Sequence, residues 1–443
     1  MKILSKTQTR KIARSGDKTR ANRSSANRVS LRSSSLSRAS ALGRLASDNA
    51  WLIFVVLLIN VLGSLMVLSA SSIESILQYG SPWAVFEHQV IWLILGTICF
   101  LVASRVDYAL WRKLSPLLLC VSAFLLLVVL VPGIGLHASG SSRWVGAGPL
   151  KLQPSELAKL ALVIFGADLL TRRQNSIDDW RKSTRPTVVI FGIFAILVMA
   201  QPDMGTTMIM CISLMCLLYL AGISRKQLFY ISGGLVVGAV IFGIAEPYRR
   251  ERLTSFLHPF AQSSTGGYQV VQSLSALGSG HIMGVGLGAS KAKWGFLPNS
   301  YTDFIFSIIG EELGLIGTIV VVLLFVCLAI IGVRIAMKCP DRFGKLLAGG
   351  IVGWITAQAI INMGAVIGIL PVTGIPLPFI SYGGSSLVFA MIAMGILSSI
   401  STRSQNTPAP LSLVHLSSDP RHVKRAKANI DHRRNSKRNS LDL

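Results

Sequence analysis

The chain has 443 residues, of which 51% are hydrophobic and only 14% are charged. Soluble domains carry about 25% charged residues, so this composition excludes an ordinary soluble enzyme and predicts a membrane protein. The formal net charge of +24 is spread unevenly along the chain. Residues 1–50 hold twelve Lys and Arg against two Asp, and residues 401–443 hold nine against three Asp.

The two basic ends contain few apolar residues, so neither can bury enough surface to offset the entropy of ordering. We therefore predict a disordered tail at 1–50, a membrane domain at 51–400 and a second disordered tail at 401–443. Basic segments beside membrane spans attract anionic headgroups or a cytoplasmic protein, and we favour these over a nucleic-acid partner. The basic stretch before the first span also predicts an uncleaved anchor rather than a signal peptide.

Apolar segments long enough to cross the hydrocarbon core recur along the membrane domain. They predict an all-α polytopic membrane protein with about ten transmembrane helices. The segments lie near residues 51–70, 90–104, 116–131, 155–171, 187–201, 204–221, 228–245, 304–333, 346–369 and 385–400.

The distribution of Lys and Arg predicts the orientation of these spans. With both tails inside, 35 of the 43 basic residues fall on the inner side, as the positive-inside rule requires. We therefore expect a multi-pass membrane protein with both termini in the cytoplasm. The segment 246–302, between helices 7 and 8, is then a large extracytoplasmic loop.

A charged pair occurs at the start of the fourth span, in the sequence KLQPSELAK. Pro154 suits a first helical turn, and Glu156 and Lys159 lie on one face of that helix because they are three residues apart. A structural ion pair is one explanation. Since Arg143 and Lys151 lie at the same outer mouth, the other explanation is a site for an anionic headgroup.

Three other polar or irregular segments interrupt the apolar pattern. Asp203 follows a Gln-Pro turn and is placed to cap the next helix. The apolar stretch 371–386 contains three prolines and three glycines, so we predict a re-entrant segment that lines a cavity before helix 10. The glycine-rich stretch 278–288 follows no strand, so a dinucleotide site is disfavoured. The six cysteines form no CxxC pair, and no metal site is predicted.

The acid most suited to catalysis is Asp303, at the junction of the large loop and the eighth span. We expect Thr302 to cap that span, with Asp303 in its first turn. At this boundary no nucleotide pool is available, so a substrate has to carry its own leaving group, such as a lipid-linked pyrophosphate. A carboxylate there can deprotonate a sugar hydroxyl as general base. Of the two acids deeper in the span, Glu311 is expected to share the cavity of Asp303, whereas Glu312 is expected to pair with another helix.

Five motifs in order resemble those of the SEDS family of bacterial wall polymerases. They are SSRWVGAGPLKLQPSELAK, QPDMGT, GYQVVQSLSALGSG, FLPNSYTDFIFSIIGEELG and ILPVTGIPLPFISYGGSS. The resemblance covers residues 51–400 and excludes the tails. It implies ten transmembrane helices and a peptidoglycan glycosyltransferase that polymerises lipid II at the outer face, beside a class B penicillin-binding protein that crosslinks the strands. The basic N-terminal tail and the KWGFLPN approach resemble the family's division polymerases more than its elongation polymerases.

The resemblance also implies functional residues. Asp303 matches the family's catalytic aspartate, Glu156 and Lys159 match its intramembrane pair, and Lys151 stands where relatives have a basic residue. Together with the loop and re-entrant segment, this gives a predicted substrate-binding set of Arg143, Lys151, Glu156, Lys159, Arg249, Gln269, Lys293 and Ser381.

Several alternatives remain at this stage. A lipid II flippase, a non-catalytic scaffold for division proteins and an elongation-type polymerase fit many of the same features. A divalent cation, Mg²⁺ or Mn²⁺, could assist the departing pyrophosphate, with Asp303 as a ligand.

Overall fold

The computed structural model describes residues 48–131, 136–138, 141–147, 150–245, 250, 255–262 and 266–403. All of them belong to one compact unit that ends at Ser404. Both predicted tails lie outside the described residues, apart from the few positions that extend the first and last helices.

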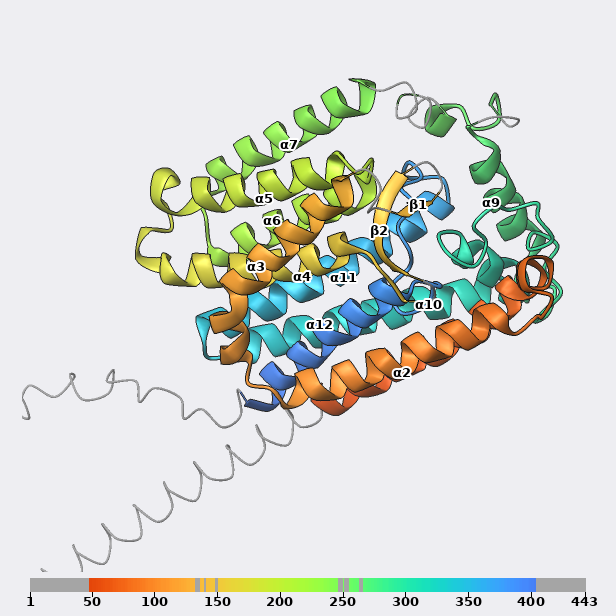
Figure 1. The fold of residues 1–443 in the computed structure, drawn as a ribbon, viewed down its shortest axis with the longest axis horizontal. Helices are drawn as coiled ribbons and strands as arrows, with labels where there is room; N and C mark the ends of the chain where they lie inside the picture. The colour runs from red at the N-terminus through yellow and green to blue at the C-terminus, as the bar shows by residue number, and fades with distance from the viewer. Residues whose placement is uncertain are drawn as a thin grey trace, which may run out of the picture. The chain divides into compact units, whose positions relative to one another are not determined.

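Long helices account for most of the described chain (Figure 1). Each of the ten predicted apolar segments falls on a separate helix, although the first helix ends nine residues after its segment and the third begins eight residues before its segment. Eight helices are long and apolar enough to cross a membrane by length and composition. The helices are Asp48–Tyr79, α2 (Ala84–Arg105), α3 (Tyr108–Leu130), α4 (Pro154–Arg172), α5 (Arg185–Met199), α6 (Met204–Ala221), α7 (Arg225–Ala245), α9 (Tyr268–Ser279), α10 (Ile305–Lys338), α11 (Arg342–Val366) and α12 (Gly384–Arg403).

Three of these helices form the centre of the bundle. Of the most apolar stretch of α12, 83% is buried, and the corresponding value for α11 is 72%, against 22% for α2 and α3. α4 packs against α3, α6 and α11, and nearly its whole length is buried. Because α4 carries an ion pair and α11 carries amides, the most deeply buried helices also hold polar groups.

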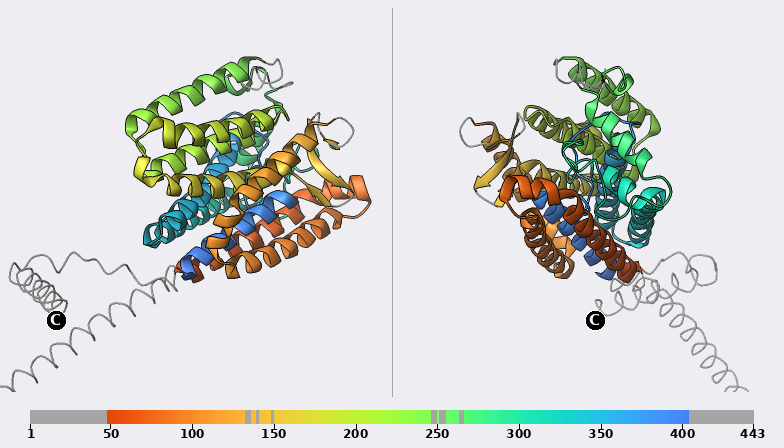
Figure 2. Two further views of the ribbon diagram at one scale, coloured as in Figure 1. Left: turned by 60° about the vertical axis from the view of Figure 1, so that its left-hand side comes forward. Right: turned by 90° about the vertical axis from the view of Figure 1, so that its right-hand side faces the viewer.

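Contacts between chain segments identify the two ends of the bundle. At one end, which we call the terminal end, Asp48 pairs with Lys338, Asn49 accepts from Ser398, and Arg403 pairs with Asp107. The opposite end carries the connections at 80–83, 200–203 and 367–383, three short strands between α3 and α4, and the helix α9 (Figures 1 and 2). We call it the sheet end.

A small antiparallel sheet, which the sequence did not predict, gives this end its name. β1 (Leu136–Ala138) pairs with β2 (Ser141–Ala147), and β2 pairs with β3 (Leu150–Leu152). β3 leads directly into Pro154 at the start of α4. The sheet therefore fixes the approach to the charged pair on that helix.

The longest helix, α10, is broken rather than straight, which corrects the expectation of one continuous apolar helix. Gly314 has φ 67° and ψ −163°, outside helical geometry. The glycine-rich loop supplies the missing partners: Val285 N and Gly286 N donate to the carbonyls of Glu311 and Glu312 at 2.9 and 3.1 Å. The loop carbonyls of His281 and Ile282 accept from the first two amides after the break. The glycine-rich loop thus completes the hydrogen bonding of a kinked helix.

Candidate functional site

Asp303 lies at the sheet end, just before α10. The first helical residue is Ile305, and Thr302 Oγ1 donates to the Asn299 carbonyl, so Thr302 does not cap the helix and Asp303 is not in its first turn. This corrects the predicted cap. Asp303 is partly exposed. Its Oδ2 atom lies close to Gly374, 3.6 Å from the position that a Cβ atom would occupy if Gly374 were alanine. The candidate base therefore faces the segment 371–377.

The segment 371–383 is non-helical and largely buried, as the proline and glycine content predicted. Ile375, Leu377 and Ile380 are each at most 3% exposed. Ser381 Oγ accepts from Leu377 N at 2.8 Å, so the serine closes a turn within the segment. Ser381 was predicted to bind substrate, but in the structure its hydroxyl is buried and holds the local backbone.

A small cleft of about 10 Å³, room for about one water molecule, lies between Asp303 and this segment. Val372, Thr373, Gly374 and Ile375 form one wall, and residues of α11 complete it, including Asn362, Ala365 and Val366. Asn362 Nδ2 donates both to the Asp303 carbonyl at 2.8 Å and to the Ile375 carbonyl at 2.7 Å. One α11 side chain thus ties the candidate base to the re-entrant segment.

Glu156 and Lys159 form a buried ion pair on α4, with 2.9 Å between Lys159 Nζ and Glu156 Oε1. The lysine side chain is only 1% exposed. Its ammonium also donates to Gln358 Oε1 at 2.9 Å and lies 5.1 Å from the ring centroid of Trp354. The pair therefore connects α4 to α11, and Lys159 has no exposed surface for a substrate.

The other two basic residues of this mouth have different environments. Arg143 on β2 donates from Nε to the Gln201 carbonyl at 3.2 Å and from Nη2 to the Pro202 carbonyl, so it holds the turn before α6. Asp203 caps α6, as predicted, by accepting from Thr206 N at 3.1 Å. Lys151 on β3 is exposed, while its carbonyl accepts from Ser385 Oγ at 2.9 Å. Lys151 remains available to an anion.

Lys293 belongs to a second buried ion pair. Its ammonium lies 3.3 Å from Glu312 Oε1 and donates to the Gly288 carbonyl at 2.7 Å. Ser69, on the first helix, donates to the same carboxylate at 2.7 Å. Glu312 therefore bridges to another helix, as predicted, and Lys293 is engaged in structural contacts.

Glu311 does not share the cleft of Asp303, which corrects the prediction. Its carboxylate accepts from the backbone N–H groups of Lys291 and Ala292 at 2.9 and 3.3 Å and from the Ser290 hydroxyl. The two neighbouring acids thus hold the loop that leads to Asp303.

Gln269 lies partly buried in the first turn of α9. Arg249 falls outside the described residues.

Two tyrosines near Asp303 were overlooked. The rings of Tyr301 and Tyr382 lie 5.7 Å apart in an edge-to-face arrangement, and Tyr382 N donates to the Tyr301 carbonyl at 3.0 Å. Burial, together with nearby Glu74, raises the pKa of Tyr301 to about 12. Its hydroxyl is therefore a neutral hydrogen-bond donor at physiological pH. The available sequence signal was a tyrosine two residues before the candidate acid and another within the predicted re-entrant segment.

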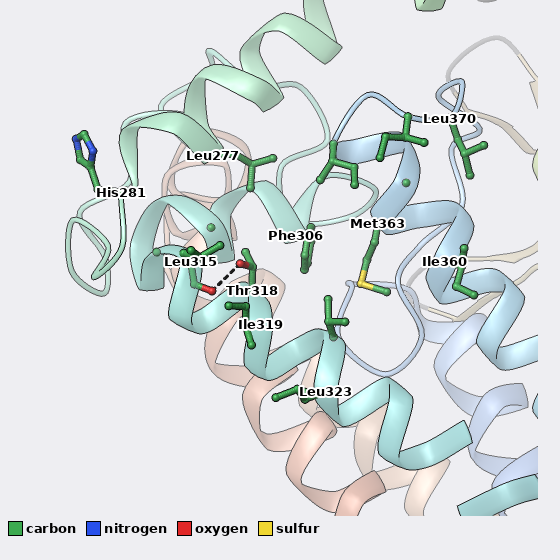
Figure 3. A pocket seen from close by; sticks show the side chains of 16 residues that line it. Leu277, His281, Phe306, Leu315, Thr318, Ile319, Leu323, Ile360, Met363 and Leu370 are labelled. Atoms are coloured by element: carbon green, nitrogen blue, oxygen red, sulfur yellow. Dashed lines mark hydrogen bonds between the residues drawn. The ribbon is translucent and has the colours of Figure 1, made fainter. Parts of the chain in front are cut away.

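An apolar groove runs beside the Asp303 cleft, between α9, α10 and α11 (Figure 3). Its volume is about 820 Å³. Phe306, three residues after Asp303, and Met363, adjacent to Asn362, both line it. The groove and the cleft therefore share the start of α10 and the end of α11, so a long apolar group in the groove can have its head near Asp303.

The carboxylates of the site do not form a protein-only metal centre. Over the described ranges, no group of three or more His, Cys, Asp or Glu side chains could hold a metal ion. A cation beside Asp303 would need substrate oxygens as its remaining ligands, as is usual for Mg²⁺ at phosphates.

Comparison with known proteins places the chain in a family. The FtsW/RodA/SpoVE family model, described as cell cycle protein, matches residues 49–406. The chain belongs to the FtsW/RodA/SpoVE family. Stage V sporulation protein E of Bacillus subtilis is 39% identical over 360 residues, which cover 81% of this chain and 98% of that protein. A probable peptidoglycan glycosyltransferase FtsW of Geobacter metallireducens is 41% identical over 350 residues, covering 78% and 92% of the two chains.

Solved structures of this family share the fold. A chain from a structure titled as the coordination of polymerization and crosslinking by a peptidoglycan synthase complex aligns with a TM-score of 0.65 at 25% identity, over 81% of this chain and 98% of that chain. The rod shape determining protein RodA of Thermus thermophilus aligns with a TM-score of 0.60 at 25% identity, over 81% and 97%. The predicted SEDS membership and polytopic helical fold are confirmed.

Proposed function

We propose that this chain is a peptidoglycan glycosyltransferase that polymerises lipid II at the outer face of the cytoplasmic membrane, with Asp303 as general base. The activity is supported by family membership and by relatives named as probable peptidoglycan glycosyltransferases at about 40% identity. The observation that carries the role of Asp303 is its partly exposed side chain just before α10, whose first turns line a large apolar groove. A lipid-linked sugar needs a groove for its prenyl chain and an accessible acid near its head.

The reaction can be followed through the residues. The carboxylate of Asp303 takes the proton of an acceptor sugar hydroxyl, and the resulting oxygen attacks the anomeric carbon of the donor. The bond from that carbon to the pyrophosphate oxygen breaks, and undecaprenyl pyrophosphate leaves with the electron pair. A single carboxylate acting by direct displacement gives inversion at that carbon.

The remaining parts of the site support binding of the lipid substrate. The groove between α9, α10 and α11 fits a prenyl chain, because it is lined by leucine, isoleucine and phenylalanine side chains. Exposed Lys151 is the basic residue best placed to attract a pyrophosphate, since Arg143, Lys159 and Lys293 already have protein partners.

The biological setting follows from the same reasoning. The number of relatives named FtsW supports a role in septal wall synthesis rather than elongation. The fold match to a polymerization and crosslinking complex supports a class B penicillin-binding protein as partner, and we extend this to other division proteins. The excess of basic residues in the inner connections and tails supports cytoplasmic termini.

Polymerisation by the purified chain tests the proposal. The full-length protein in detergent is incubated with labelled lipid II, with and without a class B partner, and the products are separated by size. Glycan strands are expected. A flippase or a scaffold would leave lipid II unchanged, because neither forms a glycosidic bond and detergent provides no second compartment.

A further inference from the structure

Three polar side chains form a stripe along α11. Trp354, Gln358 and Asn362 are spaced four residues apart, so they lie one above another on the same face. None of them is more than 2% exposed. The stripe begins at the Lys159 ammonium on α4 and ends at the backbone of Asp303.

The orientation of the Gln358 amide is fixed by its neighbours. Lys159 Nζ donates to Gln358 Oε1 at 2.9 Å, and Trp354 Nε1 donates to the same oxygen at 3.0 Å. Neither an ammonium nor an indole N–H can accept, so the amide oxygen has to face them and the amide nitrogen has to point the other way. Gln358 Nε2 accordingly donates to the Pro376 carbonyl at 3.0 Å.

The re-entrant segment needs these donors. The backbone around Pro376 is non-helical, so its carbonyls have no helical partners and require side-chain donors at this depth. Gln358 and Asn362 bind the successive carbonyls of Pro376 and Ile375. Asn362 uses its second amide hydrogen for the Asp303 carbonyl, so the segment and the base are held by the same side chain.

We propose that Gln358 and Asn362 are positioning residues, which set the segment 371–377 against Asp303, and that Lys159 acts on the reaction through the Gln358 amide rather than by binding substrate. This inference rests on the proposed function, because it assigns roles around the same base. Because the Lys159 side chain is only 1% exposed, contact through Gln358 is the route by which it reaches the sheet end.

The variant Gln358→Glu separates the two sides of this amide. Glu156→Gln is made in the same variant, so that Lys159 still faces a single carboxylate and no lone charge is buried. The new carboxylate keeps acceptors for Lys159 and Trp354 but has no hydrogen for the Pro376 carbonyl, so the bundle is expected to fold while the segment is released. Hydrogen exchange measured by mass spectrometry is expected to rise about tenfold or more in peptides from 371–383 and to stay unchanged in α4. With labelled lipid II, kcat is expected to fall about ten- to a hundredfold with little change in KM. A folded variant with wild-type exchange in 371–383 and wild-type kcat would overturn the proposal.

Asn362→Leu provides a second test with a matched control. Asn60 is a buried asparagine whose amide donates to the Val56 carbonyl within its own helix, at 2.8 Å, and to Met391 Sδ on α12, at 3.7 Å. Asn60→Leu therefore reports the cost of the same substitution away from the site. We expect Asn362→Leu to lower kcat while Asn60→Leu does not; equal kcat in the two variants would contradict a positioning role.

The route through Gln358 is tested by a double-mutant cycle. Glu156→Gln with Lys159→Met removes the ion pair without leaving a lone buried charge. This neutral pair is expected to lower kcat in the wild-type background and to cause no further loss in Gln358→Leu. Fully additive losses would mean that Lys159 acts independently of Gln358, and would overturn that part. If the wild type makes no polymer, the proposed function fails, whereas the exchange measurement still decides whether the amides hold the segment.

Discussion

The contacts of Lys293 lead to a prediction that separates a structural role from substrate binding. Its ammonium pairs with Glu312 Oε1 at 3.3 Å, and the side chains of the two partners are 4% and 0% exposed. Lys293→Met removes the positive charge and leaves a buried carboxylate, which typically costs about 3–5 kcal/mol. The two hydrogen bonds from Ser69 and Ser290 to Glu312 reduce this cost, so we expect a value near 3 kcal/mol.

The assay is thermal unfolding of the purified protein in detergent, followed by the polymerisation assay. A loss of this size corresponds to a fall in Tm of roughly 3–4 °C for a chain of this length. The compensating variant Lys293→Met with Glu312→Gln replaces the pair by neutral groups of similar volume, and such replacements are often close to neutral in stability. We expect it to recover both most of the Tm and most of the polymerase activity.

The double variant also gives the result that would refute this reasoning. If it regains the wild-type Tm but makes no glycan, Lys293 contributes directly to substrate binding or catalysis. In that case the original sequence interpretation of Lys293 as a substrate-binding residue is correct and the structural reading is wrong.

Two further predictions concern the same end of the bundle. A Cβ atom at Gly280 would lie 1.9 Å from the Gly310 carbonyl oxygen, whereas one at Gly278 would meet nothing within 4 Å. Gly280→Ala should therefore lower Tm, and Gly278→Ala should not. Equal Tm values for the two variants would refute the close packing of the loop. Because burial raises the pKa of Tyr301 from 10.0 to about 12, the unfolded phenol ionises first, and stability should fall as pH rises between these values. Tyr301→Phe should remove that part of the pH dependence in a thermal unfolding series, and an unchanged alkaline profile would contradict the burial of the hydroxyl.

The spans and the re-entrant segment could be predicted because both depend on local composition. A run of apolar residues needs no partner to indicate a membrane helix, and three prolines together with three glycines within 371–386 disfavour a continuous helix there. Asp303 could be singled out because few acids adjoin an apolar span.

The features that were missed depend on contacts between distant residues. The break at Gly314 is stable only because the loop at 281–286 binds the freed backbone groups, and a glycine in an apolar helix does not predict such a loop. The partners of Lys293 and Glu311 lie about twenty residues away and become neighbours only through that break. Gln358 and Asn362 were overlooked, although amides within an apolar span are a signal in themselves.

The most direct test of the proposed chemistry compares Asp303→Asn with Glu87→Gln in the polymerisation assay with labelled lipid II. Glu87 is an exposed carboxylate in the first turn of α2, at the same end of the bundle, so it controls for the loss of one negative charge there. We expect Asp303→Asn to remain folded and to make no detectable glycan, since the amide keeps the volume but cannot accept the proton, while Glu87→Gln polymerises at the wild-type rate. Wild-type rates from purified Asp303→Asn would contradict the assignment of Asp303 as the base.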